Sequence, residues 1–137
     1  MRIHQLSGSS GLRRFVAAPW VILDSAAWPQ WVPTLRMSVS TILDPKKSPF
    51  FQNAERALFV AEDRGRVVGR VAAIQNGWAA DAGKDPGFMG FFECVDDQEV
   101  ASMLLSSAEA WLKEKGNATV TGPLNPSTHY EGGTLIK

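Results

Sequence analysis

The sequence has no excess of charge of either sign. Lysine and arginine together number 14, aspartate and glutamate also number 14, and the formal net charge at pH 7 is zero. Proteins that bind nucleic acids or anionic membranes by electrostatic attraction usually carry a surplus of basic residues. The balance therefore predicts a partner that is neither a nucleic acid nor a membrane.

Cysteine and histidine are also scarce. The one cysteine, Cys94, cannot form a disulfide within the chain, and such usage is typical of a reducing compartment, so we expect a cytoplasmic location. Cys94 lies in an apolar stretch, which favours a packed thiol over a catalytic nucleophile. With two histidines, His4 and His129, the sequence contains no cluster with the spacing of metal ligands.

Long hydrophobic runs are missing. The longest apolar run, Phe15 to Leu23, has nine residues and contains Pro19, whereas a transmembrane helix needs about 20 apolar residues. Hydrophobic residues make up 45 % of the 137 residues and charged residues 20 %, a composition typical of a globular domain. We expect a mobile polar segment over residues 1–11 and a single domain over residues 12–137.

The most regular part of the sequence lies between Gly87 and Gly122. It predicts an aromatic strand over Phe88–Val95, an amphipathic helix over Gln98–Lys115 and a second strand over Ala118–Thr121. Apolar residues recur at spacings of three and four along the helix, and Asp96 with Glu99 matches a capping box at its start. A strand, a helix and a strand in this order form a βαβ unit with parallel strands.

A β-hairpin is predicted before this unit. Its arms are Ala57–Glu62 and Val67–Gln75, and Asp63–Arg66 forms the turn. Gly69 within the second arm indicates a bulge or a close backbone approach. The expected fold is therefore α/β (α+β), a mixed sheet with an antiparallel hairpin followed by a βαβ unit, and with the helix packed on the sheet face.

The other segments give weaker signals. Leu12–Ala17 is expected as a first strand, Phe50–Ala54 as a short helix, and Trp78–Pro86 as a polar connection with little regular structure. Pro19–Leu35 combines three tryptophans with three prolines. It is either an irregular cap over the core or an exposed aromatic surface that binds a partner or lines a cleft.

Several motifs occur in the order found in a known family. They are LDPKKSPFF at Leu43–Phe51, GRVVGRVAAI at Gly65–Ile74, FMGFFE at Phe88–Glu93 and GPLNPSTHYEGG at Gly122–Gly133. In these motifs the chain resembles the N-terminal part of a bacterial family of large GNAT-like (acyl-CoA N-acyltransferase) proteins of uncertain substrate. The resemblance implies that the domain is incomplete at its C-terminus, so that a homodimer or a missing C-terminal half would complete the sheet.

The resemblance also implies a function and a site. Proteins of the GNAT superfamily transfer an acetyl group from acetyl-CoA to an amine, which here would be an unknown small-molecule amine. The site residues implied by the resemblance are Glu93 as general base, Tyr130 as proton donor to the leaving thiolate, and Phe91, Phe92 and Asn125 as contacts of the cofactor.

One departure from the superfamily pattern opens an alternative. Superfamily members bind the CoA pyrophosphate with a glycine-containing loop before the helix, whereas this chain has Val95–Glu99 there, without glycine. The three acidic side chains in this segment oppose an anion and suit the helix dipole. The alternative function is a non-catalytic GNAT-like binding or dimerisation module that has lost the standard pyrophosphate loop. For Glu93 the corresponding alternatives are a glutamate on the solvent side of the strand and a structural pair with Arg70 across the hairpin.

Overall fold

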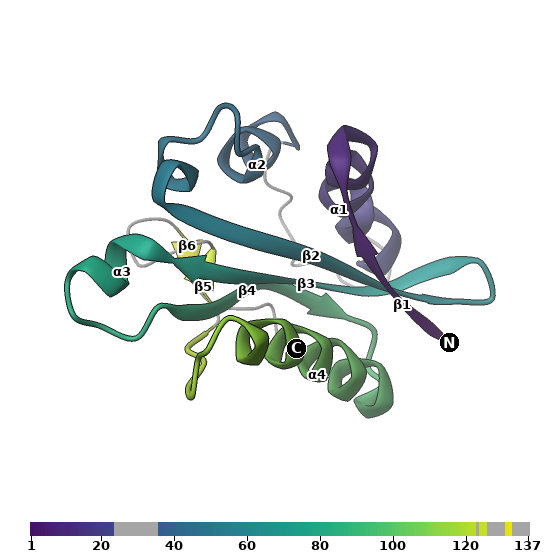
Figure 1. The fold of residues 1–137 in the computed structure, drawn as a ribbon. Helices are drawn as coiled ribbons and strands as arrows, with labels where there is room; N and C mark the ends of the chain where they lie inside the picture. Colours follow the sequence, from purple (N-terminus) through teal and green to yellow (C-terminus); the bar gives the residue numbers. More distant parts are fainter. Residues whose placement is uncertain (24–35, 123, 126–130, 133–137) are drawn as a thin grey trace.

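A four-stranded antiparallel sheet, with strands in the order β1-β2-β3-β4, lies at the centre of the chain (Figure 1). The computed structural model describes residues 1–23, 36–122, 124–125 and 131–132. The strands of this sheet are β1 (Arg2–Leu6), β2 (Ala54–Asp63), β3 (Arg66–Asn76) and β4 (Gly87–Cys94). A separate antiparallel pair consists of β5 (Leu124–Asn125) and β6 (Glu131–Gly132).

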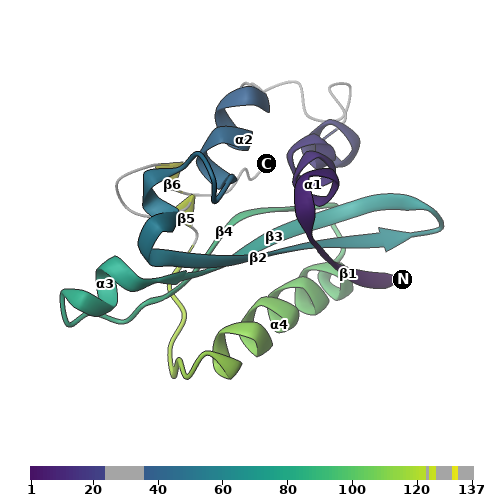
Figure 2. The same ribbon diagram turned by 45° about the horizontal axis from the view of Figure 1, so that its top comes forward.

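Helices cover both faces of the four-stranded sheet. Helices α1 (Gly8–Ile22) and α2 (Arg36–Leu43) lie on one face, and α4 (Gln98–Glu114) lies on the other (Figure 1 and Figure 2). The 3₁₀-helix η1 (Pro49–Asn53) leads into β2, and the short helix α3 (Gly77–Asp81) follows β3. The layers are those of the expected α/β fold with a helix packed on the sheet face.

The alternation of side chains along the central strands produces two cores. Leu58 and Val60 of β2 pack with α1 and α2, whereas Ala57, Phe59 and Ala61 pack with α4. Successive side chains of a strand point to opposite faces of the sheet, so a strand that is apolar on both faces needs a helical layer on each side.

The predicted hairpin is confirmed as β2 and β3, although its turn is shorter than expected. The strands remain paired through Asp63 and Arg66. The turn is formed by Arg64 and Gly65, with φ of 53° and 79°. Positive φ at both positions is typical of the two-residue type I′ turn, whose twist matches that of the flanking strands.

Gly69 has both features that the sequence indicated. The β2–β3 register shifts beside it, between Ala61 and Glu62. A Cβ atom on Gly69 would lie 2.5 Å from Cδ1 of Leu104, 3.0 Å from Cβ of Cys94 and 3.2 Å from Cγ1 of Val100. Glycine at this position therefore allows α4 to pack directly on the backbone of β3.

We expect Gly69→Ala to destabilise the protein by about 1–3 kcal/mol, since the added methyl group overpacks the α4 interface. Urea unfolding measures this cost. In a Leu104→Ala background, where the nearest atom has been removed, the same substitution is expected to cost less than about 1 kcal/mol, because the two sites share a contact and are not additive. An equal cost in both backgrounds would contradict the assigned contact.

The N-terminal expectations are wrong. Residues 2–6, expected to be part of a mobile segment, form the edge strand β1, which pairs with β2 from Arg2↔Glu62 to Leu6↔Leu58. Leu12–Ala17, expected as a strand, lies within α1. Leu12, Phe15 and Val16 are buried at helical spacing, so the apolar residues of this run follow a helical rather than a strand period.

Two further segments differ from expectation. Gly77–Asp81, at the start of the connection expected to be irregular, forms α3; the side chain of Asn76 accepts a hydrogen bond from the amide of Ala79 and caps it. Helix α2 was not predicted. Only Leu43 of its sequence RMSVSTIL is fully buried, so the apolar pattern that would indicate a helix is weak. Trp28 and Trp31, on which the two interpretations of Pro19–Leu35 depend, lie outside the described residues.

The βαβ unit is present in reduced form. Helix α4 agrees with the prediction, but its N-cap is Asp97 rather than Asp96, and the Asp97 carboxylate accepts a hydrogen bond from the amide of Glu99 at 2.9 Å. The expected strand at Ala118–Thr121 is an isolated parallel bridge between Phe88 and Thr121. Two backbone hydrogen bonds of 2.9 Å, Met89 N to Thr121 O and Thr121 N to Gly87 O, hold the chain to the beginning of β4.

Candidate functional site

An irregularity in β4 defines the site. Arg70 of β3 pairs with Glu93, and Ala72 pairs with Gly90, so that Phe91 and Phe92 together face the single residue Val71. This is a β-bulge, and Phe91 within it has a φ of 52°. A bulky side chain in the left-handed region is strained, and such residues concentrate at sites where the backbone re-aims a side chain.

The bulge decides which face of the sheet Glu93 occupies. Phe88 packs with the α1 core and Met89 with the α4 core. Strict alternation from Phe88 would send Glu93 to the α4 face, because the two positions differ by an odd number. The extra residue in β4 instead brings Glu93 to the α1 face, opposite Arg70.

Arg70 and Glu93 form a buried ion pair on this face. Nη2 of Arg70 lies 3.5 Å from Oε2 of Glu93, and the two side chains are 6 % and 19 % exposed. Within the described part of the chain, neither Oε2 of Glu93 nor Nε of Arg70 has a hydrogen-bond partner. The carboxylate is thus attracted to the guanidinium while its buried oxygen keeps an open acceptor position.

Arg70 is held from the other side by α1. Its Nη1 donates a hydrogen bond of 3.0 Å to the backbone carbonyl of Phe15. In an α-helix this carbonyl would accept the N–H of the residue four positions later, but that residue is Pro19, which has no N–H. Because Pro19 has no N–H to donate, the Phe15 carbonyl stays available as an acceptor, and Arg70 uses it.

Aromatic rings complete the surroundings of the guanidinium. Its central carbon lies 4.8 Å from the ring centroid of Phe15 and 5.7 Å from that of Phe91. The two rings contact each other edge to face, with centroids 6.2 Å apart. A cation enclosed by aromatic faces is stabilised by their quadrupoles while water is excluded.

Burial dominates the electrostatics of the pair. It raises the pKa of the Glu93 carboxyl, against the opposing attraction of Arg70. It also lowers the pKa of Arg70 to about 10, against the attraction of Glu93. A carboxylate with a raised pKa is a stronger base than an exposed glutamate, which suits it to accept a proton near neutral pH.

The other residues predicted for the site are distributed differently. Phe91 is buried in the α1 core, whereas Phe92 is partly buried against the α4 core, so the two rings lie on opposite faces. Asn125 is part of β5, and its backbone pairs with Glu131. Tyr130 lies outside the described residues. Cofactor contacts by Phe91, Phe92 and Asn125, and proton donation by Tyr130, stay predictions.

The acidic junction before α4 fits a helix cap. Asp97 uses its carboxylate on the amide of Glu99, and Asp96 and Glu99 place further negative charge beside the same helix end. A diphosphate would meet repulsion there and would have to displace the Asp97 carboxylate. The segment where the superfamily holds the CoA pyrophosphate thus does not fit that group in the standard way.

Cys94, the other nucleophilic candidate, is a packed thiol. It lies half-buried against the α4 core, and its Sγ donates to the carbonyl of Val95 at 2.9 Å. Burial raises the pKa of the thiol, which disfavours the reactive thiolate. Among the described residues, no group of three or more histidine, cysteine, aspartate or glutamate side chains could hold a metal ion.

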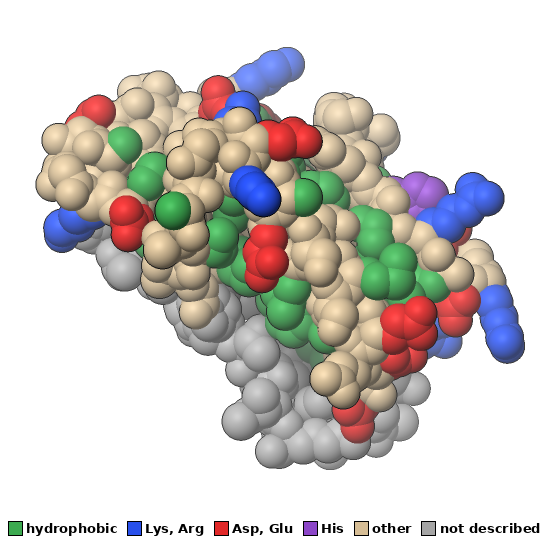
Figure 3. Space-filling model, turned by 60° about the horizontal axis from the view of Figure 1, so that its bottom comes forward, with side chains coloured by type: hydrophobic (Ala, Val, Ile, Leu, Met, Phe, Trp, Pro, Cys, Tyr) green, Lys and Arg blue, Asp and Glu red, His purple; other side chains and the backbone are tan. Residues whose placement is uncertain are grey.

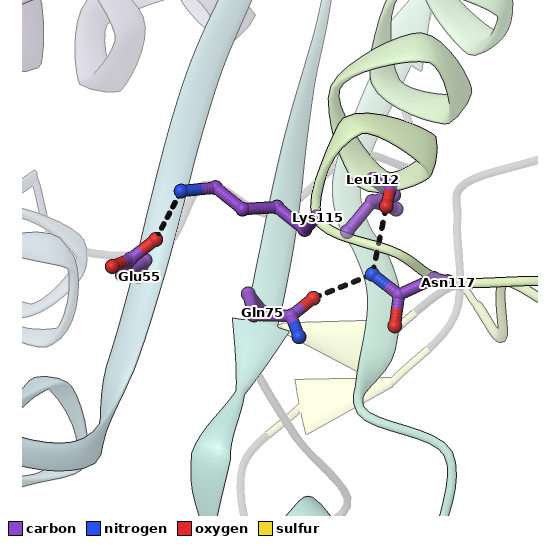
Figure 4. Close-up of polar contacts among 5 residues, drawn as sticks. All are labelled: Glu55, Gln75, Leu112, Lys115 and Asn117. Atoms are coloured by element: carbon purple, nitrogen blue, oxygen red, sulfur yellow. Dashed lines mark hydrogen bonds and ion pairs between the residues drawn. The ribbon is translucent and has the colours of Figure 1, made fainter.

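A second polar cluster ties the end of α4 to the sheet at a distance from this pair (Figure 4). Asn117 Nδ2 donates to Gln75 Oε1 at 2.6 Å and to the carbonyl of Leu112 at 2.9 Å, and Lys115 pairs with Glu55 at 2.5 Å. A hollow of about 430 Å³ beside it is lined by Gln52, Asn53, Ala54, Glu55, Gln75, Gly77 and Lys115. The hydrogen bond from Asn117 satisfies the Leu112 carbonyl in the last turn of α4. The other two contacts tie this end of the helix to β2 and β3, so the cluster is structural.

The α4 side of the molecule shows acidic and basic side chains interspersed, with hydrophobic groups between them (Figure 3). This pattern agrees with the neutral balance of the sequence. No helix within the described ranges is long and apolar enough to cross a membrane.

Sequence reasoning named Arg70 only as a structural partner of Glu93 and did not name Phe15 as a site residue. The sequence offered a structural pair with Arg70 as an alternative to the base role of Glu93, and this pair is present. Phe15 was missed because its segment was assigned to a strand. The proline four residues after it is the signal that could have identified a free helix carbonyl.

Comparison with known proteins gives two bacterial relatives. No protein-family model matches the chain. It is 36 % identical over 127 residues to "Bacterial ceramide synthase" of Caulobacter vibrioides (strain NA1000 / CB15N), a match that covers 91 % of this chain and 33 % of that protein. It is 32 % identical over 127 residues to "Protein YghO" of Escherichia coli (strain K12), covering 92 % and 32 %. The chain spans about a third of the length of these relatives.

Solved structures establish the fold. The chain is similar to AAC(6')-Iy in complex with the bisubstrate analogue CoA-S-monomethyl-acetylneamine, with a TM-score of 0.54 and 15 % identity over 99 % of this chain and 95 % of that one. It is also similar to a structure described as a probable acetyltransferase, with a TM-score of 0.55 and 14 % identity over 100 % and 98 %. The GNAT-like fold expected from the sequence is confirmed.

Proposed function

We propose, since the chain has the fold of the GNAT acetyltransferases, that it forms part of an acyl-CoA N-acyltransferase whose acceptor is an amine. The observation that carries this proposal is the position of Glu93. The bulge in β4 aims this carboxylate at the α1 face, burial raises its pKa, and its Oε2 has no hydrogen-bond partner among the described residues. These are the properties of a general base for an amine.

The role of Glu93 is to take a proton from the acceptor. An acyl-CoA, with acetyl-CoA as the simplest case, supplies an activated thioester carbonyl. As the acceptor nitrogen forms its bond to this carbon and the carbon–sulfur bond breaks, the nitrogen must lose a proton, and Glu93 accepts it directly or through water. Tyr130 is proposed to protonate the departing sulfur.

The Caulobacter relative supports a more specific acceptor class. It carries the name bacterial ceramide synthase, and a ceramide is the amide of a fatty acid and a long-chain amino alcohol. Formation of such an amide from an acyl-CoA is the reaction type described above. We therefore extend the proposal to a long-chain amine acceptor, and to a catalytic unit completed by further polypeptide or by a second copy of this chain.

The acidic start of α4 favours a second candidate function. Because Asp97 caps the amide of Glu99 where a pyrophosphate would bind, the domain could instead be a non-catalytic GNAT-like module that binds a partner or dimerises. The two functions differ in whether the chain binds coenzyme A.

Thermal-shift titration of the full chain with acetyl-CoA and with a long-chain acyl-CoA separates them. If the acyltransferase proposal holds, a hundredfold excess over Kd stabilises the protein by about 2.7 kcal/mol, and coenzyme A release is detected when a long-chain amine is added. Free coenzyme A serves as the control for binding without an acyl group. The absence of a shift at millimolar concentrations of all three ligands would reject acyl-CoA as a ligand of this chain and support the module.

A further inference from the structure

We propose that Arg70, anchored on the helix carbonyl that Pro19 leaves free, is a positioning residue for Glu93. Only the expected effect of Arg70 on catalysis rests on the proposed function. The link between Arg70 and Glu93 concerns contacts within this chain, and it can be tested without a substrate.

The first observation is how firmly Arg70 is fixed. It projects from β3, a strand paired on both sides, and the residue is buried. A hydrogen bond of 3.0 Å to the Phe15 carbonyl and the rings of Phe15 and Phe91 hold the guanidinium from α1 and β4. A side chain with a planar fork and several fixed contacts has little freedom to follow the carboxylate, so the carboxylate must follow it.

The second observation is that Pro19 and the β4 bulge serve the same arrangement. A proline inside a helix costs about 3 kcal/mol relative to alanine, and Phe91 in the bulge is in a strained backbone region. Pro19 leaves the Phe15 carbonyl available to Nη1 of Arg70, and the bulge brings Glu93 to Nη2. Two unfavourable local features that meet at one ion pair indicate that its geometry matters beyond packing.

The third observation is the incomplete satisfaction of the pair. Oε2 of Glu93 lies 3.5 Å from Nη2 of Arg70 and has no hydrogen bond in the described part of the chain. A pair that served stability alone would be expected to close into a forked, doubly hydrogen-bonded geometry. Here Arg70 orients the carboxylate by charge and, among the described residues, leaves the buried Oε2 without a hydrogen bond.

The surroundings of Glu93 identify the groups that can influence it. Arg70 is the charged group that faces Glu93 from β3, α1 contributes the Phe15 ring and carbonyl, and β4 contributes the Phe91 ring. Among the described residues, removal of the guanidinium therefore leaves apolar groups around the carboxylate. A lysine at this position keeps the charge but lacks the planar fork, so it holds the carboxylate less firmly.

The test is the titration of Glu93 in the full chain, by NMR of the carboxyl carbon in protein labelled at glutamate, with Glu93→Gln used to assign the signal. Arg70→Met is expected to raise the pKa of Glu93 by about one unit or more, and Arg70→Lys by about half a unit. Arg14→Met, which breaks the exposed pair of Arg14 with Glu62, is the matched control and is expected to leave it unchanged. An unchanged pKa in whichever Arg70 variant folds would overturn the proposal.

Activity provides the second readout. Arg70→Lys is expected to lower kcat at least about tenfold, with the rising limb of its pH profile displaced in parallel with the pKa of Glu93. If the wild-type chain shows no acyl transfer, the proposed function fails, while the titration still decides whether Arg70 controls Glu93. A wild-type kcat in Arg70→Lys would overturn the positioning role.

Discussion

Glu93→Gln is expected to lower kcat for acyl transfer by about 100- to 10,000-fold, the usual contribution of a positioned general base. Glutamine keeps the shape of the side chain and an oxygen facing Arg70, but it cannot accept the proton of the acceptor amine. KM for the acyl donor is expected to change little, because the carboxylate acts on the acceptor. Steady-state kinetics with a long-chain amine and an acyl-CoA measure both constants.

The matched control is Glu62→Gln, which removes a carboxylate from the same sheet but from a surface pair with Arg14. It is expected to retain wild-type kcat, since exposed pairs contribute little and the partner of Glu62 is Arg14 rather than Arg70. Wild-type activity in Glu93→Gln would contradict the assignment of the base.

The pH profile of the wild type gives an independent check on this assignment. The base must be deprotonated to act, so activity is present above the pKa of Glu93 and is lost as the pH falls through it. Because burial raises this pKa, the loss is expected at a higher pH than for an exposed glutamate. The rising limb should be missing from the residual activity of Glu93→Gln.

Phe15→Ala is expected to destabilise the protein by about 3–5 kcal/mol, the range observed for large-to-small changes of buried aromatic residues. Phe15 is 0 % exposed, contacts Phe91 edge to face and covers the Arg70 guanidinium. Its removal leaves a cavity next to a buried charge. Urea unfolding followed by circular dichroism measures the loss.

Val21→Ala on the same helix is the control for Phe15→Ala. Val21 is 39 % exposed, and surface substitutions usually change stability by no more than about 0.5 kcal/mol. A similar effect of both substitutions would show that α1 does not pack on the sheet through Phe15.

The hairpin and α4 could be predicted because their signals are local. Arg64-Gly65 between two apolar runs specifies a tight turn, and the apolar spacing of Val100, Leu104, Ala108 and Leu112 specifies one buried face. The N-terminal region failed for the opposite reason. Strand β1 has little burial of its own and is stabilised by pairing with β2, some fifty residues away in sequence, so nothing within it identifies a strand.

The candidate site was predicted only in part. The resemblance implied Glu93 as a base, and a structural pair of Glu93 with Arg70 across the hairpin was an alternative to that role. Whether the two side chains share a face depends on the register, and a register shift of one residue reverses every side chain. The FMGFFE motif does not reveal that an extra residue is accommodated at Phe91.

The sequence by itself determined the neutral net charge, the hairpin, the amphipathic helix α4 and the residue types available for chemistry. These properties follow from composition and from spacings of a few residues. The tertiary structure alone decided that Glu93 lies on the α1 face, and that the carbonyl freed by Pro19 meets Arg70. Those facts depend on strand register and on contacts between segments about fifty residues apart in the chain, which local patterns do not encode.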